Sequence, residues 1–449
     1  MDKTDHVLNF IMGLRPSDLP ARVVHQAKRC FLDAMGAMIA GTRTPVARLM
    51  ASFAAANFAG DDCTIILDGR RASPVGAALA NGYAANALDL DDGFRLVKGH
   101  PGACTLPVLM AASEIAKKSL AGGEFLTALV IGYEVAIRSG LIRHALSTTV
   151  HASGSWGAIG GAALSGRLLD LGRRELREAL GVAEHHAPIS NVMKALDKPC
   201  NGKDSVGWGA MVGISSALMA RQGFSGVNPF FEESPDPSWV EGLGNEYFFL
   251  DLYFKPYSAC RWAQPAIMGA LRLFIDNELT VESIASIAIR TFKAAAALSN
   301  THPTDTEEAQ YNMAYPVAAV LVDGEVGPCQ VQPPRIFDRA ILSLADKVRV
   351  EVKEEFENAF PRKTIAEVTI VTRDGRKLES GPVEPKWEPP LLPSNEELEQ
   401  KFLGLVTPVL GEQKCHRLVK LAWSLDQIES TKEILDACLN NSIEPALSC

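Results

Sequence analysis

The apolar periodicity of this chain changes near residue 265, and this change constrains the fold more than any other feature of the sequence. Before it, apolar residues recur at helical spacing, as Val23, Ala27 and Phe31 do. After it, the alternating segments VESIASIAIRTF, KVRVEV and AEVTIVTRDGRKL predict strands, and Asp374-Gly375 predicts a hairpin. With 449 residues, the chain is long enough for two domains. We predict a mainly α fold class with an α+β segment in the second half.

Helical patterns surround the predicted strands on both sides. The expected helices cover residues 20–41, 74–88, 105–118, 123–140, 153–170, 173–183, 205–222, 309–322 and 338–346. Residues 381–394 hold five prolines and predict no regular element. A capping box at Ser394–Glu397 then predicts a return to helix. We therefore expect a helical domain built from both chain ends, residues 1–265 and 393–449, and an inserted α+β domain, residues 266–392.

The composition excludes several classes of function. A net charge of −9 argues against a nucleic-acid partner, which requires a basic surface. The N-terminal apolar run is too short for a signal peptide, and 128–137, interrupted by Glu134, predicts a buried helix rather than a membrane span. The nine cysteines are scattered without a CxxC pair, so neither a disulfide framework nor a thiolate zinc site is expected. Reduced thiols fit the cytoplasm or another reducing compartment.

The segment NALDLDDGFRLVKGHPGA concentrates charged side chains after a small-residue helix. Clustered acids at a helix C-terminus oppose the helix dipole, so something must compensate for them. The segment is either a solvated loop or a functional site, and the Pro-Gly after the histidine favours a defined turn. Its charged residues are Asp89, Asp91, Asp92, Arg95, Lys98 and His100.

Three further segments carry weaker signals. His151 precedes a glycine-rich helix, and a lone histidine is more often structural than functional. The pair His185-His186 has no third ligand at metal-binding spacing. In ALDKPCNGKDSVGWGA, Lys198 and Lys203 precede a helix start, where they either bind an anion or are simply solvated.

The segment YFKPYSACRWAQPA brings Lys255, Tyr257 and Arg261, which suit carboxylate binding or an ordinary domain junction. Tyr315 lies on a predicted helix, where an aromatic side chain is usually core. The chain contains no nucleotide P-loop and no dinucleotide fingerprint. The remaining acids, histidines, lysines and tyrosines fit general acid–base catalysis on an anionic substrate. A proton moved next to a carboxylate would lead to dehydration, epimerisation or decarboxylation.

Four motifs occur together, and in this order the chain resembles the MmgE/PrpD family over nearly its whole length. They are ALDLDD followed by GHPGA, VHASGSWGAIGGAA, KPCNGKDSVGWGAMVG and KPYSACR. That family includes 2-methylcitrate dehydratase, cis-aconitate decarboxylase and iminodisuccinate epimerase. The resemblance implies a cofactor-free, homodimeric enzyme with a helical domain and a lid, acting on a small polycarboxylate.

The resemblance also implies roles for individual residues. The implied catalytic residues are Asp89, His100, His151, Lys198 and Tyr315. The implied substrate-binding residues are Lys255, Tyr257 and Arg261, and from their own segments we expect Asp92 and Lys203 to bind the substrate as well. Gly93 stands where the family usually has threonine, and Asn201 where it has histidine, which predicts a different substrate. We expect a citrate-like dehydratase first, with a decarboxylase, an epimerase or an inactive acid-binding homologue as alternatives.

Overall fold

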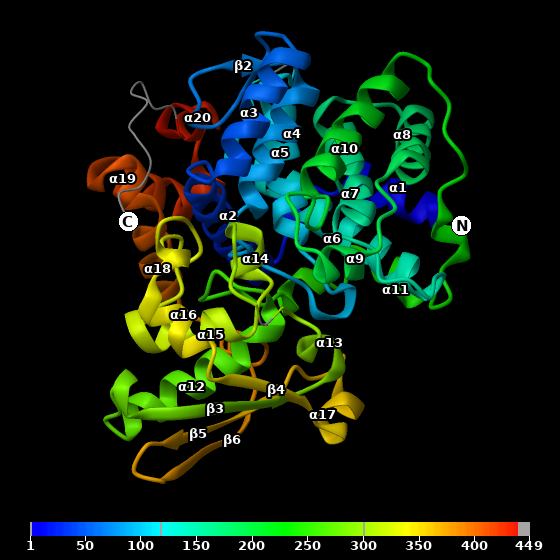
Figure 1. Cartoon of the computed structure of the whole chain (residues 1–449). Coiled ribbons are helices and arrows are strands. Elements are labelled where there is room, and N and C mark those ends of the chain that lie inside the picture. Colours follow the sequence, from blue (N-terminus) through cyan, green and yellow to red (C-terminus); the bar gives the residue numbers. More distant parts are fainter. Residues whose placement is uncertain (1, 117–118, 300, 439–449) are drawn as a thin grey trace.

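The computed structural model describes residues 2–116, 119–299 and 301–438 (Figure 1). Its first half is helical: α1 (Lys3–Gly13), α2 (Ala21–Gly41), α3 (Pro45–Asn57), α4 (Pro74–Asn86), α5 (Pro101–Glu114), α6 (Gly122–Ala145), α7 (Gly154–Leu168), α8 (Arg173–His186), α9 (Val192–Asp197), α10 (Val206–Arg221) and α11 (Ser238–Glu241). A short hairpin, β1 (Cys63–Thr64) and β2 (Arg71–Ala72), interrupts it. The mainly α fold class is confirmed. The helix predicted from residue 105 already begins at Pro101, because proline suits the first helical turn.

Helices α6 and α7 form the centre of the helical part. The α6 helix is long and apolar enough to cross a membrane by length and composition, yet its most apolar 18-residue window is fully buried inside the protein. Its Glu134 carboxylate lies 3.0 Å from Arg138. Glycines of α7 allow close approach: a Cβ at Gly160 would lie 2.4 Å from the Gly132 carbonyl oxygen of α6. The expected buried helix is therefore present, and the glycines of α7 let α7 pack closely against α6.

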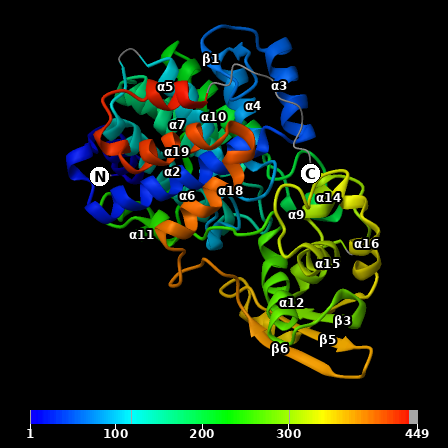
Figure 2. The same cartoon turned by 90° about the vertical axis from the view of Figure 1, so that its left-hand side faces the viewer.

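The last described helices of the chain pack against helices from its N-terminal part. They are α18 (Asn395–Leu410), α19 (Glu412–Trp423) and α20 (Lys432–Cys438). Both views show α18 beside α2 (Figures 1 and 2). The predicted capping box is present, with Glu397 N–H donating to Ser394 Oγ at 3.2 Å and Ser394 N–H to Glu397 Oε2 at 2.9 Å. The helical part therefore contains both ends of the described chain, while the predicted boundaries at 265 and 392 and the lid role stay predictions.

A four-stranded sheet in the order β4-β3-β5-β6 forms the α+β part at the bottom of Figure 1. Its strands are β3 (Ile284–Thr291), β4 (Val348–Val352), β5 (Ala366–Thr372) and β6 (Lys377–Val383). Its helices are α12 (Gln264–Asp276), α13 (Lys293–Ala296), α14 (Thr306–Gln310), α15 (Ala314–Asp323), α16 (Arg339–Ala345) and α17 (Glu354–Ala359). The hairpin predicted at Asp374-Gly375 joins β5 to β6, with Gly375 at φ +91°.

Two local predictions in this part were wrong. Strand β6 extends to Val383 through Pro382, inside the stretch expected to hold no regular element. It is an edge strand with an irregular register, where proline is tolerated. The helix expected over 309–322 is broken between α14 and α15, because the Asn312 side chain accepts the Tyr315 N–H at 2.8 Å and starts a new helix.

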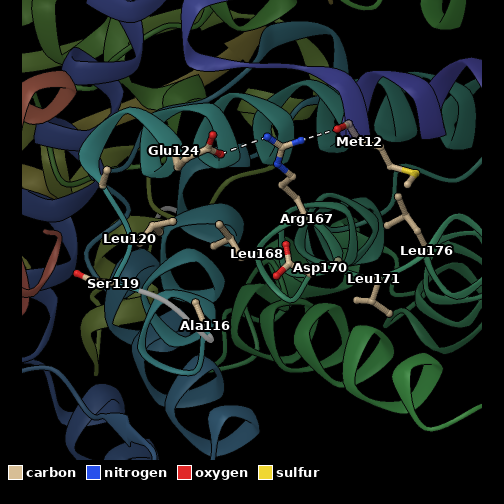
Figure 3. A pocket seen from close by; sticks show the side chains of 12 residues that line it. Met12, Ala116, Ser119, Leu120, Glu124, Arg167, Leu168, Asp170, Leu171 and Leu176 are labelled. Atoms are coloured by element: carbon tan, nitrogen blue, oxygen red, sulfur yellow. Dashed lines mark hydrogen bonds and ion pairs between the residues drawn. The ribbon is translucent and has the colours of Figure 1, made fainter. Parts of the chain in front are cut away.

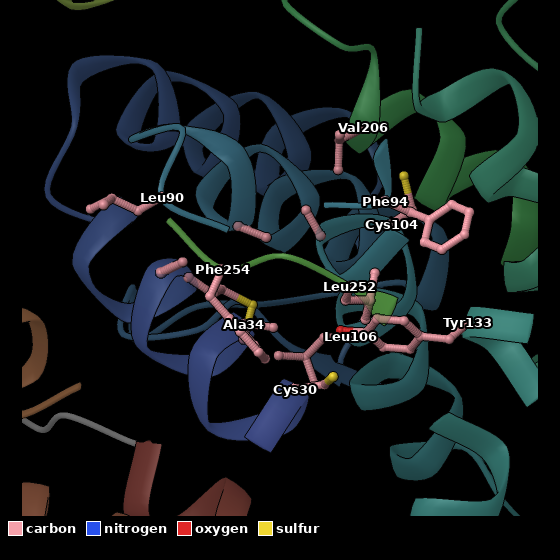
Figure 4. Packing of buried hydrophobic residues seen from close by; sticks show 14 of the residues in the cluster. Cys30, Ala34, Leu90, Phe94, Cys104, Leu106, Tyr133, Val206, Leu252 and Phe254 are labelled. Atoms are coloured by element: carbon pink, nitrogen blue, oxygen red, sulfur yellow. The ribbon is translucent and has the colours of Figure 1, made fainter. Parts of the chain in front are cut away.

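Apolar side chains support the charged segment that follows α4. Figure 4 shows Cys30 and Ala34 of α2, Cys104 and Leu106 of α5 and Tyr133 of α6 near Leu252 and Phe254. All of these side chains are buried members of the main core. Loop 87–100 and the segment before Lys255 are therefore anchored in the same hydrophobic core. This packing fixes the positions of the charged side chains in both segments.

Candidate active site

The acids after α4 are buried, not solvated. Asp89 is 1% exposed and adopts a left-handed conformation at φ +53°. Asp91 is fully buried, and its carboxylate accepts a hydrogen bond from Asn86 Nδ2 at 3.0 Å. Because buried carboxylates are costly unless they are paired, the loop needs cations or donors close by. This arrangement decides against the alternative of a solvated loop.

Two buried lysines from distant segments approach Asp89. Lys255 Nζ lies 2.8 Å from Asp89 Oδ2, and Lys203 Nζ lies 4.0 Å from Asp89 Oδ1. Lys203 also donates to the Asn86 carbonyl at 2.6 Å and to Gln310 Oε1 at 2.7 Å. Lys203 is therefore held beneath the acid, and it does not line the pocket described below.

The His100 imidazole is held between carboxylates. Its Nδ1 lies 2.9 Å from Asp91 Oδ2, while its Nε2 lies 3.6 Å from Asp89 Oδ1 and 4.0 Å from Asp204 Oδ2. Burial alone would lower the pKa of His100, but the Asp91 and Asp204 carboxylates outweigh it and raise the pKa to about 9. For Asp91, burial alone would raise the pKa, but the His100 imidazolium outweighs burial and lowers the pKa of Asp91 to about 2. At neutral pH the pair is an imidazolium–carboxylate.

The Nε2 atom of His100 faces the Asp89 and Asp204 carboxylates, which are too distant to accept a hydrogen bond from it. Behind them, Tyr311 Oη donates to Asp204 Oδ2 at 2.9 Å, and Ser153 Oγ donates to Asp204 Oδ1 at 3.3 Å. Ser153 Oγ also accepts the His100 N–H at 3.0 Å. The imidazolium is therefore fixed from one side while its Nε2–H remains available to a bound molecule.

A pocket opens over this cluster, at the border between the helical and the α+β parts. Its basic lining residues are Arg95, Lys98 and Arg261, beside His100. Arg261 Nη2 is paired with Glu388 Oε1 at 2.5 Å, and its guanidinium lies 4.6 Å from the centre of the Tyr253 ring. The other lining residues are Asp89, Val192, Leu196, Asp204, Tyr253, Cys260, Trp262, Tyr311 and Phe360. Such a combination of cations, acids and a protonated imidazole suits a polyanionic molecule that undergoes proton transfer.

Several residues predicted from the sequence lie outside this pocket. Lys198 is exposed at the end of α9. His151 is buried and stacks on His144, with ring centres 6.1 Å apart. The Tyr315 hydroxyl donates to the Gln330 carbonyl, and Tyr257 is partly buried. The catalytic roles of Lys198, His151 and Tyr315 and the binding role of Tyr257 therefore stay predictions that the pocket's lining does not support.

Asp92 points away from the pocket into the helical core. Its Oδ2 accepts the Tyr133 hydroxyl at 2.6 Å, and its Oδ1 accepts the Gly102 N–H at 3.0 Å. Burial, with the nearby Asp33 carboxylate, raises the pKa of Asp92 to about 7. Its hydrogen bonds hold the start of α5, next to His100, so this geometry favours a supporting position over the substrate contact that was predicted.

Sequence reasoning missed Asp204 and Tyr311, which the structure places at the centre of the site. Asp204 directly follows Lys203 in a segment already noted for its lysines. Tyr311 lies four residues before Tyr315, at the break between α14 and α15. The aspartate could have been found as one more charged residue in its motif. The tyrosine depends on the helix break, which the apolar pattern does not show.

Asp89, His100 and Asp204 also present potential ligand atoms within 4.8 Å of one another, which a metal ion could use. However, the lysines beside Asp89 and the proton on His100 already supply positive charge at this place. A metal ion would have to displace that proton. These three side chains are therefore candidates for acid–base chemistry.

A larger pocket lies on the helical part, among Met12, Leu120, Glu124, Arg167 and Leu176 (Figure 3). The Arg167 guanidinium donates to the Met12 carbonyl at 2.6 Å and to Glu124 Oε2 at 3.2 Å. The one arginine of this pocket is already paired with Glu124, so no unpaired cation among its described lining residues is left to bind an anion. These lining residues also include no histidine.

Comparison with known proteins supports the resemblance seen in the sequence. The chain is 27% identical to the cis-aconitate decarboxylase-like protein oryM of Aspergillus oryzae, with 96% of both chains covered. It is 26% identical to cis-aconitate decarboxylase of Homo sapiens, covering 95% of this chain and 92% of that protein. Residues 5–236 match the MmgE/PrpD N-terminal domain, and residues 257–427 match the MmgE/PrpD C-terminal domain. The chain therefore belongs to the MmgE/PrpD family.

Proposed function

We propose that this protein is a carboxy-lyase that decarboxylates a cis-aconitate-like tricarboxylic acid, with His100 as the general acid. The observation that carries the proposal is the His100 imidazole, held 2.9 Å from Asp91 and facing a pocket lined by three basic side chains. The names of the curated relatives support the same reaction.

The basic residues of the pocket match the charge of such a substrate. Arg95, Lys98 and Arg261 can each pair with a carboxylate. Arg261 is paired with Glu388, so a substrate carboxylate would share or replace that contact. Asp89, with its Lys255 partner, would keep the reacting carbons close to His100 by repelling the carboxylates toward the basic side.

The proposed step needs a proton donor at an alkene carbon. In cis-aconitate, the bond between the methylene carbon and its carboxylate breaks, and its electron pair forms a new double bond to the central carbon. The former double-bond pair takes a proton from His100 Nε2 at the other alkene carbon, and carbon dioxide leaves. The neutral imidazole then regains a proton from solvent. A protonated histidine suits this step, whereas dehydration begins with a base.

Dehydration of a citrate-like acid was the first expectation from the sequence. The relatives' activities and the protonation of His100 both favour the decarboxylase alternative instead. We therefore place decarboxylation first, with dehydration and epimerisation as distinguishable outcomes of one experiment.

That experiment incubates the pure protein with cis-aconitate, 2-methylcitrate, citrate and iminodisuccinate in deuterated water. We expect carbon dioxide from cis-aconitate, with deuterium on one carbon of the product, because the transferred proton exchanges with solvent. Loss of water without carbon dioxide would identify a dehydratase, and exchange without either would identify an epimerase. Binding of these acids without any reaction would identify an inactive acid-binding homologue.

The activity should fall in alkaline solution. Because catalysis needs protonated His100, we expect kcat/KM to decrease as the pH rises through about 9. The folded pKa of this histidine is raised above its usual value of about 6.5. Its contribution to stability is therefore complete below about pH 6.5 and is lost as the pH rises through about 9. Initial rates and thermal unfolding measured between pH 6 and 10 test both effects, and a flat rate profile would contradict the assignment.

A further inference from the structure

Gly93 and Tyr253 are direct neighbours at the edge of the candidate pocket, which Tyr253 lines. They form an isolated antiparallel bridge, with Gly93 N–H donating to the Tyr253 carbonyl at 3.0 Å and Tyr253 N–H to the Gly93 carbonyl at 2.9 Å. A Cβ atom on Gly93 would lie 2.1 Å from Tyr253 Oη and 2.2 Å from its Cζ. Such distances are impossible for a real side chain, so the position of the tyrosine ring requires glycine at residue 93.

The Tyr253 hydroxyl has an unusual environment. Its side chain is buried and lines the pocket together with Asp89 and His100. Arg261 covers one face of the ring. Among the described residues, no hydrogen-bond partner of the hydroxyl is found, and its oxygen does not belong to the fully buried unpaired polar atoms, so it is open to the pocket. A donor in this position is therefore placed for a bound molecule.

The protonation of Tyr253 fits that use. Burial raises the pKa of its phenol well above the ordinary value; Arg261 opposes the shift, and the Glu388 and Asp89 carboxylates add to it. The hydroxyl therefore keeps its proton at neutral pH and can donate to an anion.

We infer that the Tyr253 hydroxyl donates a hydrogen bond to a substrate carboxylate, and that Gly93 serves as the gap that admits the tyrosine ring. This inference rests on the proposed polycarboxylate substrate and adds a residue that decides which acid fits. The family resemblance predicts threonine at residue 93, and its hydroxyl is absent here. In the proposed site, the hydroxyl of Tyr253 takes its place.

Tyr253→Phe tests the inference, because it removes only the hydroxyl. The probe for binding is tricarballylate, a saturated tricarboxylate that has neither a double bond nor a hydroxyl to react, measured by titration calorimetry. A hydrogen bond to a charged group predicts a loss of affinity of about 10- to 100-fold, with a similar loss in kcat/KM for cis-aconitate. The midpoint of thermal unfolding should stay the same or rise, because the hydroxyl bonds to no other residue in the described part of the chain.

Tyr247→Phe is the matched control. Tyr247 is also buried, and its hydroxyl also lacks a partner among the described residues, but it lies outside the pocket. Its variant should bind tricarballylate like the parent protein. If Tyr253→Phe also binds like the parent, the inference is overturned while the proposed function stands. If the parent protein binds no tricarballylate and decarboxylates no acid, both are overturned.

Gly93→Ala provides a second, independent measurement. In the parent protein, the added methyl group must displace the Tyr253 ring and should weaken tricarballylate binding by at least as much as Tyr253→Phe does. In a Tyr253→Ala background the clash is gone, so the same substitution should cost little further affinity. Losses that simply add in the double variant would show that the two residues act separately and would overturn the gap role of Gly93.

Discussion

Replacing His100 with glutamine is expected to lower kcat for decarboxylation by a factor of about 10³, within the range usual for a lost general acid. Glutamine can occupy a similar volume and can still donate a hydrogen bond, but it cannot transfer a proton. In the parent protein, the imidazolium is fixed by Asp91 at 2.9 Å while its Nε2 faces the pocket. The loss should therefore appear in kcat, with a much smaller change in the affinity for tricarballylate.

The measurement is carbon dioxide release from cis-aconitate under saturating substrate, together with calorimetric binding. His186→Gln is the control, because His186 is an exposed histidine on α8. Some loss of stability is expected in His100→Gln, since Asp91 remains buried without its cation. Retention of tricarballylate binding distinguishes a lost proton donor from a lost fold. An unchanged kcat in a folded variant would remove His100 from the mechanism.

The core of this site could be predicted from the sequence because charge must be compensated wherever it is buried. The acids after α4 required cations, and the structure brings Lys255 to Asp89 from a segment far along the chain. The motif around His100 likewise predicted a defined turn, and the imidazole does lie among the acids. The local motif therefore indicated that compensation was needed, whereas the lysine that supplies it comes from a distant segment.

Other parts of the site depend on tertiary geometry that no local pattern contains. Tyr311, rather than Tyr315, reaches the pocket because Asn312 interrupts the helix between them. Lys198 and Lys203 are five residues apart, yet one is exposed and the other is buried beneath Asp89. Helix periodicity cannot decide which residue of such a pair turns inward, because the choice is made by packing between distant segments.

In the fold, too, local signals were predicted correctly and features that depend on tertiary packing were not. The β5–β6 hairpin and the cap of α18 were predicted correctly, because a turn dipeptide and a capping box act over a few residues. The strand through Pro382 was missed, because only the order of the sheet makes β6 an edge strand. Prediction from sequence was therefore reliable for short-range hydrogen bonding and failed where an element's neighbours decide its conformation.

Replacing Lys255 with methionine should have the largest effect on stability of any single change at this site. Lys255 is 1% exposed and Asp89 is also 1% exposed, so the substitution leaves a buried carboxylate without its closest cation. Breaking a buried ion pair by removing one partner typically costs about 3–5 kcal/mol. Lys203, at 4.0 Å and already bound to two other oxygens, can compensate only in part. Activity should be lost as well, because the charge facing His100 changes.

Urea unfolding of three variants separates these effects. Lys363→Met is the matched control: Lys363 pairs with Glu384 at the same 2.8 Å, but at the surface, where such a pair contributes at most about 1 kcal/mol. The double variant Asp89→Asn, Lys255→Met should recover much of the lost stability, since the unpaired charge is gone, yet remain inactive because the acid facing His100 Nε2 is gone. Recovery of stability without recovery of turnover would show that the pair acts in catalysis as well as in folding. If Lys255→Met unfolds at the same urea concentration as the control, the buried pair does not stabilise this loop.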